Sequence, residues 1–155
     1  MSDQTRAGNA NQILWFGDNL MTIRVPASAG EISVIECRMP QGETTPLYVT
    51  LSGDEVIHML EGTMQFFVDG KDFLAHVGQT VMAPRGLPHH FRIESTDAAT
   101  CLIVTQSGVF EQMVRQMSLP LQADVLPSRV ERDASRRFFD TPAQRNIEVV
   151  GAPLP

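Results

Sequence analysis

The stretch that decides the fold covers residues 42–62 and reads GETTPLYVTLSGDEVIHMLEG. Two short runs of alternating apolar and polar residues flank a Ser-Gly-Asp turn, and a Leu-Glu-Gly turn follows, which predicts consecutive β-strands joined by tight turns. Side chains on a strand alternate between its two faces, so each strand groups its residues into two sets. The sets of interest are Tyr48 with Thr50 on the first strand, and Glu55 with Ile57 and Met59 on the second.

Short apolar runs of the same kind lie on both sides of this stretch. They cover residues 13–16, 20–25, 32–39, 63–68, 73–77, 78–83, 89–93 and 100–105. Strands of this length, separated by turns every eight to twelve residues or so, are typical of an antiparallel sandwich or barrel. No alternation of strands with helices is visible, so a parallel sheet is not expected.

The C-terminal part of the chain has a different pattern. After Gly108 the spacing of apolar residues changes from two to about 3.6, which predicts an amphipathic helix. A capping-box pattern at residues 128–131 predicts the start of a second helix, and residues 146–150 are expected to return to extended structure. We therefore predict an N-terminal flexible arm at 1–11, a β-barrel at 12–106, and a C-terminal extension at 107–155 whose two helices pack on the barrel.

Composition narrows the class of partner. The chain has 155 residues, 43% of them hydrophobic, which suits one domain with one sizeable core. A formal net charge of −6 argues against nucleic acid or an anionic membrane, because both bind basic patches. Cys37 and Cys101 lie in apolar runs without metal-ligand spacing and are expected to be buried thiols. No apolar run approaches a membrane span and no secretory signal is visible, so we expect a cytoplasmic protein with a small molecule or another protein as partner.

Two spaced signatures make the chain resemble the cupin family. The first signature is Gly, five residues, His-x-His, three or four residues, Glu, six residues, Gly, and its places fall on Gly42, Tyr48, Thr50, Glu55 and Gly62. The second is Gly, five residues, Pro-x-Gly, two residues, His, three residues, Asn, and its places fall on Gly78, Pro84, Gly86, His89 and Ile93. The tail after Gly108 further resembles the single-domain quercetin dioxygenase-like subgroup. The resemblance implies a double-stranded β-helix, the all-β jelly roll of the cupin barrel.

In metal-binding cupins the two histidines and the glutamate of the first signature and the histidine of the second hold a divalent metal. Carried over to this chain, Glu55 and His89 are the ligand-type residues, whereas Tyr48 and Thr50 stand where the two histidines would be. A neutral phenol and a hydroxyl are poor ligands beside imidazole, so metal affinity should collapse. We therefore predict no metal cofactor. The alternative is a divalent transition metal held by Glu55 and His89 with help from Tyr48.

Two interpretations stay open for these side chains. In the first, Glu55 and His89 transfer protons and Tyr48 stabilises developing negative charge, with Thr50 assisting in substrate binding. In the second, Glu55 and His89 are relics of a lost metal site, and Tyr48 and Thr50 merely fill the space left by metal and imidazoles. The apolar part of a substrate is expected to contact Ile57, Met59 and Phe91.

The favoured hypothesis for function is a metal-independent enzyme acting on a small apolar, aromatic or polyketide-like molecule inside the barrel. Acid–base chemistry would serve a cyclisation, an isomerisation or an elimination. The alternatives are a metal-dependent dioxygenase of the quercetinase type with a reduced ligand set, and a non-catalytic protein that binds a small ligand. Cupins commonly pair through strands, and the apolar segment near Trp15 suits exchange with a partner, so we also predict a homodimer.

Overall fold

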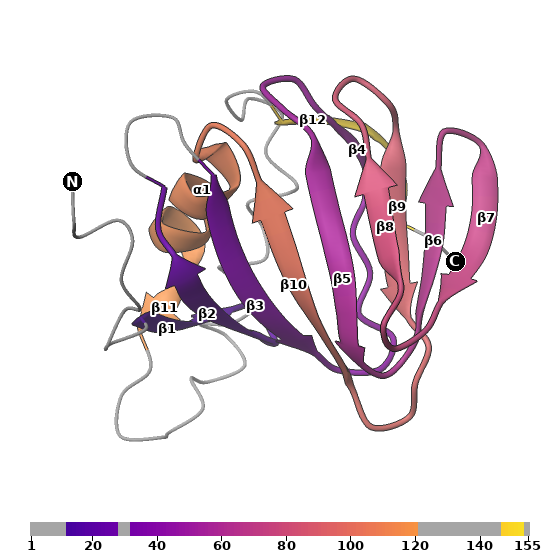
Figure 1. Ribbon diagram of the computed structural model, residues 1–155, viewed down its shortest axis with the longest axis horizontal. Helices are drawn as coiled ribbons and strands as arrows, with labels where there is room; N and C mark the ends of the chain where they lie inside the picture. Colours follow the sequence, from indigo (N-terminus) through magenta and orange to yellow (C-terminus); the bar gives the residue numbers. More distant parts are fainter. Residues whose placement is uncertain (1–11, 28–31, 121–146, 154–155) are drawn as a thin grey trace.

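A computed structural model describes residues 12–27, 32–120 and 147–153 (Figure 1). Strands dominate these residues, as predicted. They are β1 (Gln12–Phe16), β2 (Asn19–Val25), β3 (Ser33–Met39), β4 (Leu47–Thr50), β5 (Glu55–Glu61), β6 (Met64–Val68), β7 (Lys71–Ala75), β8 (Thr80–Ala83), β9 (His89–Ile93), β10 (Ala99–Thr105), β11 (Leu119–Pro120) and β12 (Ile147–Gly151). The helix α1 (Val109–Met117) follows β10.

The strands form two antiparallel sheets that face each other (Figure 1). The seven-stranded sheet has the order β11-β1-β2-β3-β10-β5-β8, and the five-stranded sheet has the order β12-β4-β9-β6-β7. The chain crosses between the sheets repeatedly, so neighbours in a sheet are often distant in sequence. This arrangement is the double-stranded β-helix, or jelly roll, that the sequence predicted.

The predicted alternation along the central strand is confirmed. On β5 the side chains of Glu55, Ile57 and Met59 are buried, and those between them are only half-buried. His58 has the opposite parity and its Nδ1 lies 2.8 Å from the hydroxyl of Thr80. Side chains of the buried parity from both sheets fill the core. The inward direction of Glu55 is therefore fixed by the same pleat that packs the apolar residues.

The two cysteines meet inside the barrel. Cys37 of β3 and Cys101 of β10 are directly opposite each other in the strand pairing, and both are buried free thiols. The prediction of buried, reduced thiols is confirmed.

Gly62 shows why the first signature ends in glycine. Its φ is +77°, and a Cβ at this position would lie 2.4 Å from the carbonyl oxygen of Ala98 and 2.9 Å from the Cα of Ala99. An L-residue rarely adopts this backbone conformation, and neighbouring backbone atoms leave no room for a side chain. The turn from β5 into β6 therefore depends on glycine.

One predicted hairpin is displaced by two residues. The sequence suggested a turn at 69–71 and a strand at 73–77, whereas β7 covers Lys71–Ala75. Asp69 has φ +48° and Gly70 has φ +81°, so these two residues make the turn and β7 begins directly after them. Two-residue turns with positive φ at both positions match the twist of the strands that they join.

The C-terminal extension contributes to the barrel itself. The helix α1 begins after Gly108, as predicted, and buries Met113 and Val114. Beyond it, β12 pairs with β4, with Ile147 opposite Thr50 (Figure 1). The extension is therefore not purely a helical layer on the outside, because its last strand completes the five-stranded sheet. The predicted arm at 1–11 and the second helix from 128 lie outside the described residues. Within the described part of the chain, no helix is long and apolar enough to cross a membrane.

Candidate active site

Three side chains from three strands meet inside the barrel. Tyr48 of β4 is paired directly with His89 of β9, and their ring centroids are 4.3 Å apart. The Tyr48 hydroxyl donates to the Glu55 carboxylate, with its oxygen 3.1 Å from Oε2 and 3.3 Å from Oε1. His89 Nε2 lies 3.3 Å from the same Oε2. Their exposed fractions are 5%, 2% and 2% for Tyr48, Glu55 and His89, so this is a group of buried, mutually bonded polar side chains.

A backbone carbonyl fixes the hydrogen on the imidazole. His89 Nδ1 lies 3.0 Å from the carbonyl oxygen of Leu87, and a carbonyl only accepts, so Nδ1 carries a hydrogen. A hydrogen bond between Nε2 and Glu55 requires one further proton, either on Nε2 or on the carboxyl group. Without this proton, the lone pair of Nε2 would face the negatively charged carboxylate in a buried site, which is unfavourable. The pair therefore holds the proton.

The titration of the group follows from this arrangement. Burial alone lowers the pKa of His89, but the hydrogen bond and the charge of Glu55, with the Leu87 carbonyl, outweigh it and raise the pKa above 6.5. Burial, then the charge and hydrogen bond of Glu55, raises the pKa of Tyr48 well above 10. The phenol therefore stays a hydrogen-bond donor at any physiological pH, and the imidazole keeps its second proton to a higher pH than a free histidine does.

A cavity of about 230 Å³ opens beside this group. Tyr48 and Glu55 form one part of its wall, and most of the rest is apolar. The lining residues are Phe16, Asn19, Met21, Met39, Glu43, Thr44, Thr45, Pro46, Tyr48, Glu55, Phe91, Ile103, Phe110 and Pro153. An apolar cavity of roughly 150 Å³ binds benzene in another protein, so this volume suits a small aromatic molecule.

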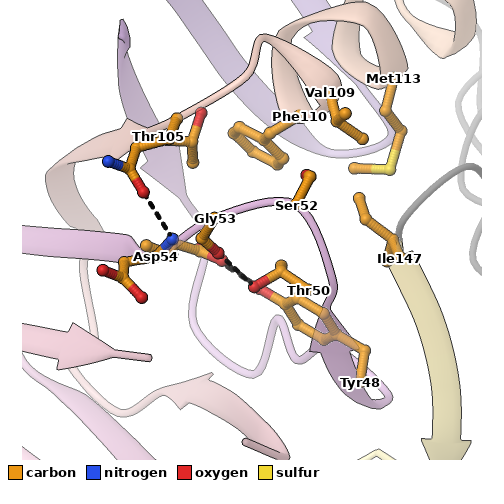
Figure 2. Close-up of a pocket in the computed structure, with 12 residues that line it drawn as sticks. Tyr48, Thr50, Ser52, Gly53, Asp54, Thr105, Val109, Phe110, Met113 and Ile147 are labelled. Carbon is orange, nitrogen blue, oxygen red and sulfur yellow. Dashed lines mark hydrogen bonds between the residues drawn. The ribbon is translucent and has the colours of Figure 1, made fainter. Parts of the chain in front are cut away.

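A second, smaller cavity of about 20 Å³ lies on the other side of the same carboxylate. Figure 2 shows Val109, Phe110 and Met113 of α1 close to the turn that holds Ser52 and Gly53, with Ile147 of β12 beside them. Tyr48, Glu55 and Phe110 line both cavities. The volume of the smaller cavity is close to that of one water molecule, so the larger cavity is the candidate ligand site.

The structure distributes the predicted substrate-binding residues among different environments. Phe91 lines the larger cavity, as the sequence suggested. Thr50 lines the smaller one, and its hydroxyl donates to the Gly53 carbonyl at 2.9 Å (Figure 2). Ile57 and Met59 share the face of Glu55 but are 1% and 0% exposed and line neither cavity. The inner face is packed solid at that end of β5, so parity alone did not identify a pocket.

His89 occupies a different place from the one predicted for a direct acid or base. It contacts Glu55 and Tyr48 but lines neither cavity, because those two side chains stand between it and the open space. Of Glu55 and His89, it is therefore Glu55 that can touch a ligand in the larger cavity. Any effect of His89 on such a ligand would pass through Glu55, to which it is bonded.

Sequence reasoning missed a second set of polar side chains at the larger cavity. Asn19, Glu43 and Thr45 line it, and all three lie outside the ligand places of either signature. Asn19 and Glu43 are 6% and 8% exposed. In the sequence, Asn19 stands only at the start of an expected strand, and Glu43 and Thr45 stand only in the segment before one. Polar residues are common at such positions, so they do not identify a site.

The donor set does not fit a divalent metal ion. Such ions take at least three protein ligands from His, Cys, Asp and Glu in most sites. Among the described residues, no group of three such side chains is arranged to hold a metal ion. Glu55 and His89 are already bonded to each other, and the Thr50 hydroxyl is engaged by the backbone.

Comparison with known proteins finds a family that is similar to part of this chain. Residues 35–105 match the family model described as a cupin domain. The matched residues contain all three members of the buried group and both signatures, which begin at Gly42 and Gly78.

Two curated relatives and one solved structure illustrate the range of this fold. The chain is 27% identical over 104 residues to acetate kinase EutQ of Clostridioides difficile (strain 630), and this alignment covers 67% of this chain and 60% of that protein. It is 25% identical over 145 residues to quercetin 2,3-dioxygenase of Bacillus subtilis (strain 168), and this second alignment covers 92% of this chain and 42% of that protein. The chain thus spans 60% and 42% of the length of these relatives.

Among solved structures, the nucleoside dehydratase Pac13 is similar, with a TM-score of 0.55 at 9% identity over 69% of this chain and 85% of that one. At such low identity the likeness concerns the fold alone. Proteins with different chemistry share this cupin fold, so function has to be argued from the site.

Proposed function

We propose that this protein is a metal-independent enzyme that transfers protons to and from a small, largely apolar and aromatic molecule bound in the larger cavity. The observation that carries the proposal is the buried group of Tyr48, Glu55 and His89, which presents one carboxyl group and one phenol to an apolar cavity. A polar group of this kind is costly to bury, and perturbed titration in a cleft is a marker of catalytic sites.

The elementary step uses Glu55 as the base. Its carboxylate takes a proton from a carbon next to a carbonyl group. The electron pair of the broken C–H bond forms a C=C bond, and the π pair of the carbonyl group moves onto its oxygen. Because Glu55 loses its negative charge when it takes the proton, the Tyr48 hydroxyl is released from the carboxylate and donates to that oxygen as negative charge develops. Return of the proton at another carbon gives an isomerisation, attack of the new carbon nucleophile within the molecule gives a cyclisation, and loss of a leaving group gives an elimination. In this step the shared proton lies on Nε2, so Glu55 is free to act as the base and the positive charge of His89 offsets the developing negative charge.

The runner-up is a metal-dependent dioxygenase of the quercetinase type. It is favoured by the match to quercetin 2,3-dioxygenase, which extends over 92% of this chain. The donor set at Glu55 and His89 speaks against it. A third possibility is a protein that binds a small ligand without turnover, and the fold permits each of the three.

The test uses acetophenone, an aromatic ketone with exchangeable protons next to its carbonyl group. We expect the purified protein to catalyse exchange of these protons in D₂O, measured by NMR, in the presence of a chelator. Glu55→Gln should lower the rate by about 100-fold or more, as for loss of a general base. Glu61→Gln changes an exposed carboxylate on the same strand and should leave the rate unchanged.

Each other outcome points to a different function. Exchange that persists in Glu55→Gln removes the carboxylate from the mechanism and overturns the proposal. Oxygen consumption with quercetin that follows the stoichiometric content of iron, nickel or manganese supports the runner-up. Acetophenone binding without any exchange supports the binding protein. The homodimer stays a prediction, and a monomer in light scattering at micromolar concentration would contradict it.

A further inference from the structure

The larger and the smaller cavity share three described lining residues, and the proposed mechanism uses two of them. Tyr48 and Glu55 belong to the catalytic group, and the third is Phe110 of α1. The ring of Phe110 takes no part in proton transfer. Because it belongs to both linings, the two cavities adjoin each other at this ring, next to the carboxylate and the phenol. Phe110 therefore separates two spaces that a ligand at Glu55 would otherwise occupy together.

The helical turn that carries Phe110 is held in place by the next residue. Glu111 is buried, the backbone N–H of Ala27 donates to its Oε1 at 2.7 Å, and Arg115 Nε donates to its Oε2 at 3.1 Å. On the same helix the side chain of Val114 is buried in the core. Breaking hydrogen bonds to a buried carboxylate is costly, so α1 is fixed against the barrel at this turn.

The start of α1 is also bonded to the turn that lines the smaller cavity. Ser107 Oγ donates to Ser52 Oγ at 2.8 Å, directly before the helix begins. Figure 2 shows Phe110 close to this turn, which holds Ser52 and Gly53. The helix is thus bonded to Ala27 on one side and to the turn on the other. The ring of Phe110 is therefore a fixed partition between the cavities.

The smaller cavity has no room for part of a ligand while this ring is present. Its volume is about 20 Å³, against about 230 Å³ for the larger cavity. On the side of α1 and β12 its wall is apolar and consists of Val109, Met113 and Ile147. Removal of the ring would join this apolar space to the larger cavity beside the catalytic carboxylate. An alkyl chain is the kind of group that such a space would take.

We propose that Phe110 is a specificity-determining residue that closes the larger cavity on the side of α1, so that the ligand class is an aromatic ketone with a short alkyl group on its carbonyl carbon. This inference rests on the proposed function, which places the carbonyl group against Tyr48 and Glu55. Those two residues line both cavities, so a ketone with its aromatic ring in the larger cavity directs its alkyl group towards the smaller one. A longer chain then meets the ring of Phe110.

The test compares acetophenone with butyrophenone, which has two more CH₂ groups on the alkyl side of the carbonyl. We expect wild-type protein to bind butyrophenone no more tightly than acetophenone in isothermal titration. In Phe110→Ala the chain enters the joined space, and each buried CH₂ should raise the affinity about fourfold, or about 15-fold for the two. Phe110→Leu removes less of the partition and should change the ratio in the same direction, which keeps the test decisive should Phe110→Ala not fold.

Two further variants show where the chain lies. Met117→Ala shortens another half-buried apolar side chain of α1 that lines neither cavity, so it should keep the wild-type ratio of the two affinities. Val109→Phe, added to Phe110→Ala, refills the smaller cavity from the adjacent position and should return the ratio to the wild-type value. A gain that persists in this double variant would place the chain elsewhere and overturn the inference.

The affinity ratio and the exchange rate separate this inference from the proposed function. Wild-type protein that already prefers butyrophenone, a ratio unchanged in both Phe110 variants, or failure of both ketones to bind overturns the inference. Acetophenone exchange that depends on Glu55 leaves the proposed function standing in each of these cases. The expected ratios without any exchange support the limit set by Phe110 and contradict the catalytic proposal.

Discussion

The proton shared by Glu55 and His89 should make folding stability depend on pH in a defined direction. The perturbation is His89→Gln, which removes the titrating ring and leaves a side chain that can still donate to Glu55. In the native protein the pKa of His89 is raised, because Glu55 and the Leu87 carbonyl together outweigh the effect of burial. In the unfolded chain the same histidine should titrate near 6.5.

The sign and the size follow from the difference in bound protons. Below about pH 6.5 both states carry the proton on His89, and the stabilising contribution is fully present. Above that pH the unfolded chain loses its proton first, so the free energy of unfolding falls until native His89 also deprotonates. One proton gives a maximal slope of about 1.4 kcal/mol per pH unit. We expect the free energy of unfolding of the wild-type protein to fall with pH above 6.5, at no more than this slope, and the His89→Gln curve to lack this fall.

Urea denaturation followed by the fluorescence of Trp15, the one tryptophan in the sequence, measures both curves between pH 6 and 9 or so. The difference between the curves isolates His89. His90, whose pKa is lowered by burial, contributes with the opposite sign but is present in both proteins. A difference that is constant or grows with pH above 6.5 would show that the imidazole does not hold the extra proton, and the description of the buried pair would be wrong.

Further predictions concern the turn, the phenol and the thiols. Gly62→Ala should lower the free energy of unfolding by about 2 kcal/mol or more, because backbone strain adds to the clash with Ala98. In Gly70→Ala the new Cβ has no atom within 4 Å, so only the strain remains and the loss should be about 1 kcal/mol in the same urea denaturation assay. Tyr48→Phe should fold but slow acetophenone exchange by about 10- to 100-fold, through loss of the donor to the developing oxyanion; unchanged exchange would exclude that role. Burial, then the contact with Cys101, raises the pKa of Cys37 well above its ordinary value, so both thiols should resist a thiol reagent until the protein is unfolded in urea.

The fold could be predicted because its determinants are local and periodic. The alternation around Glu55 decides which side chains turn inward, and glycine at 62 stands where a side chain would strike the backbone of Ala98. Both features are readable from residue type and spacing. The closing strand β12 was only suggested as extended structure, since its pairing with β4 joins segments about 100 residues apart and no local pattern encodes such a partner.

The site could be predicted only as far as the signatures reach. Parity grouped Glu55 with Ile57 and Met59, and all three are buried, but Ile57 and Met59 lie in the packed core and line neither cavity. The alternation along a strand predicts on which face of the sheet a side chain lies, but it does not predict whether open space adjoins that side chain. It therefore cannot distinguish a residue in a cavity wall from one in the packed core. Asn19 lies outside both signatures and enters the cavity because β2 is folded beside β3, a relation that only the three-dimensional structure shows.

Tyr48 stands at a place where the first signature has a histidine, and its contacts bear on the chemistry that we propose. Its ring lies against the imidazole of His89, and its hydroxyl donates to the Glu55 carboxylate. The imidazole is left with the carboxylate and the Leu87 carbonyl as partners, which keeps its second proton in place. Glu55 lines the larger cavity and is bonded to this imidazole, and such a pair suits the proton transfer that we propose.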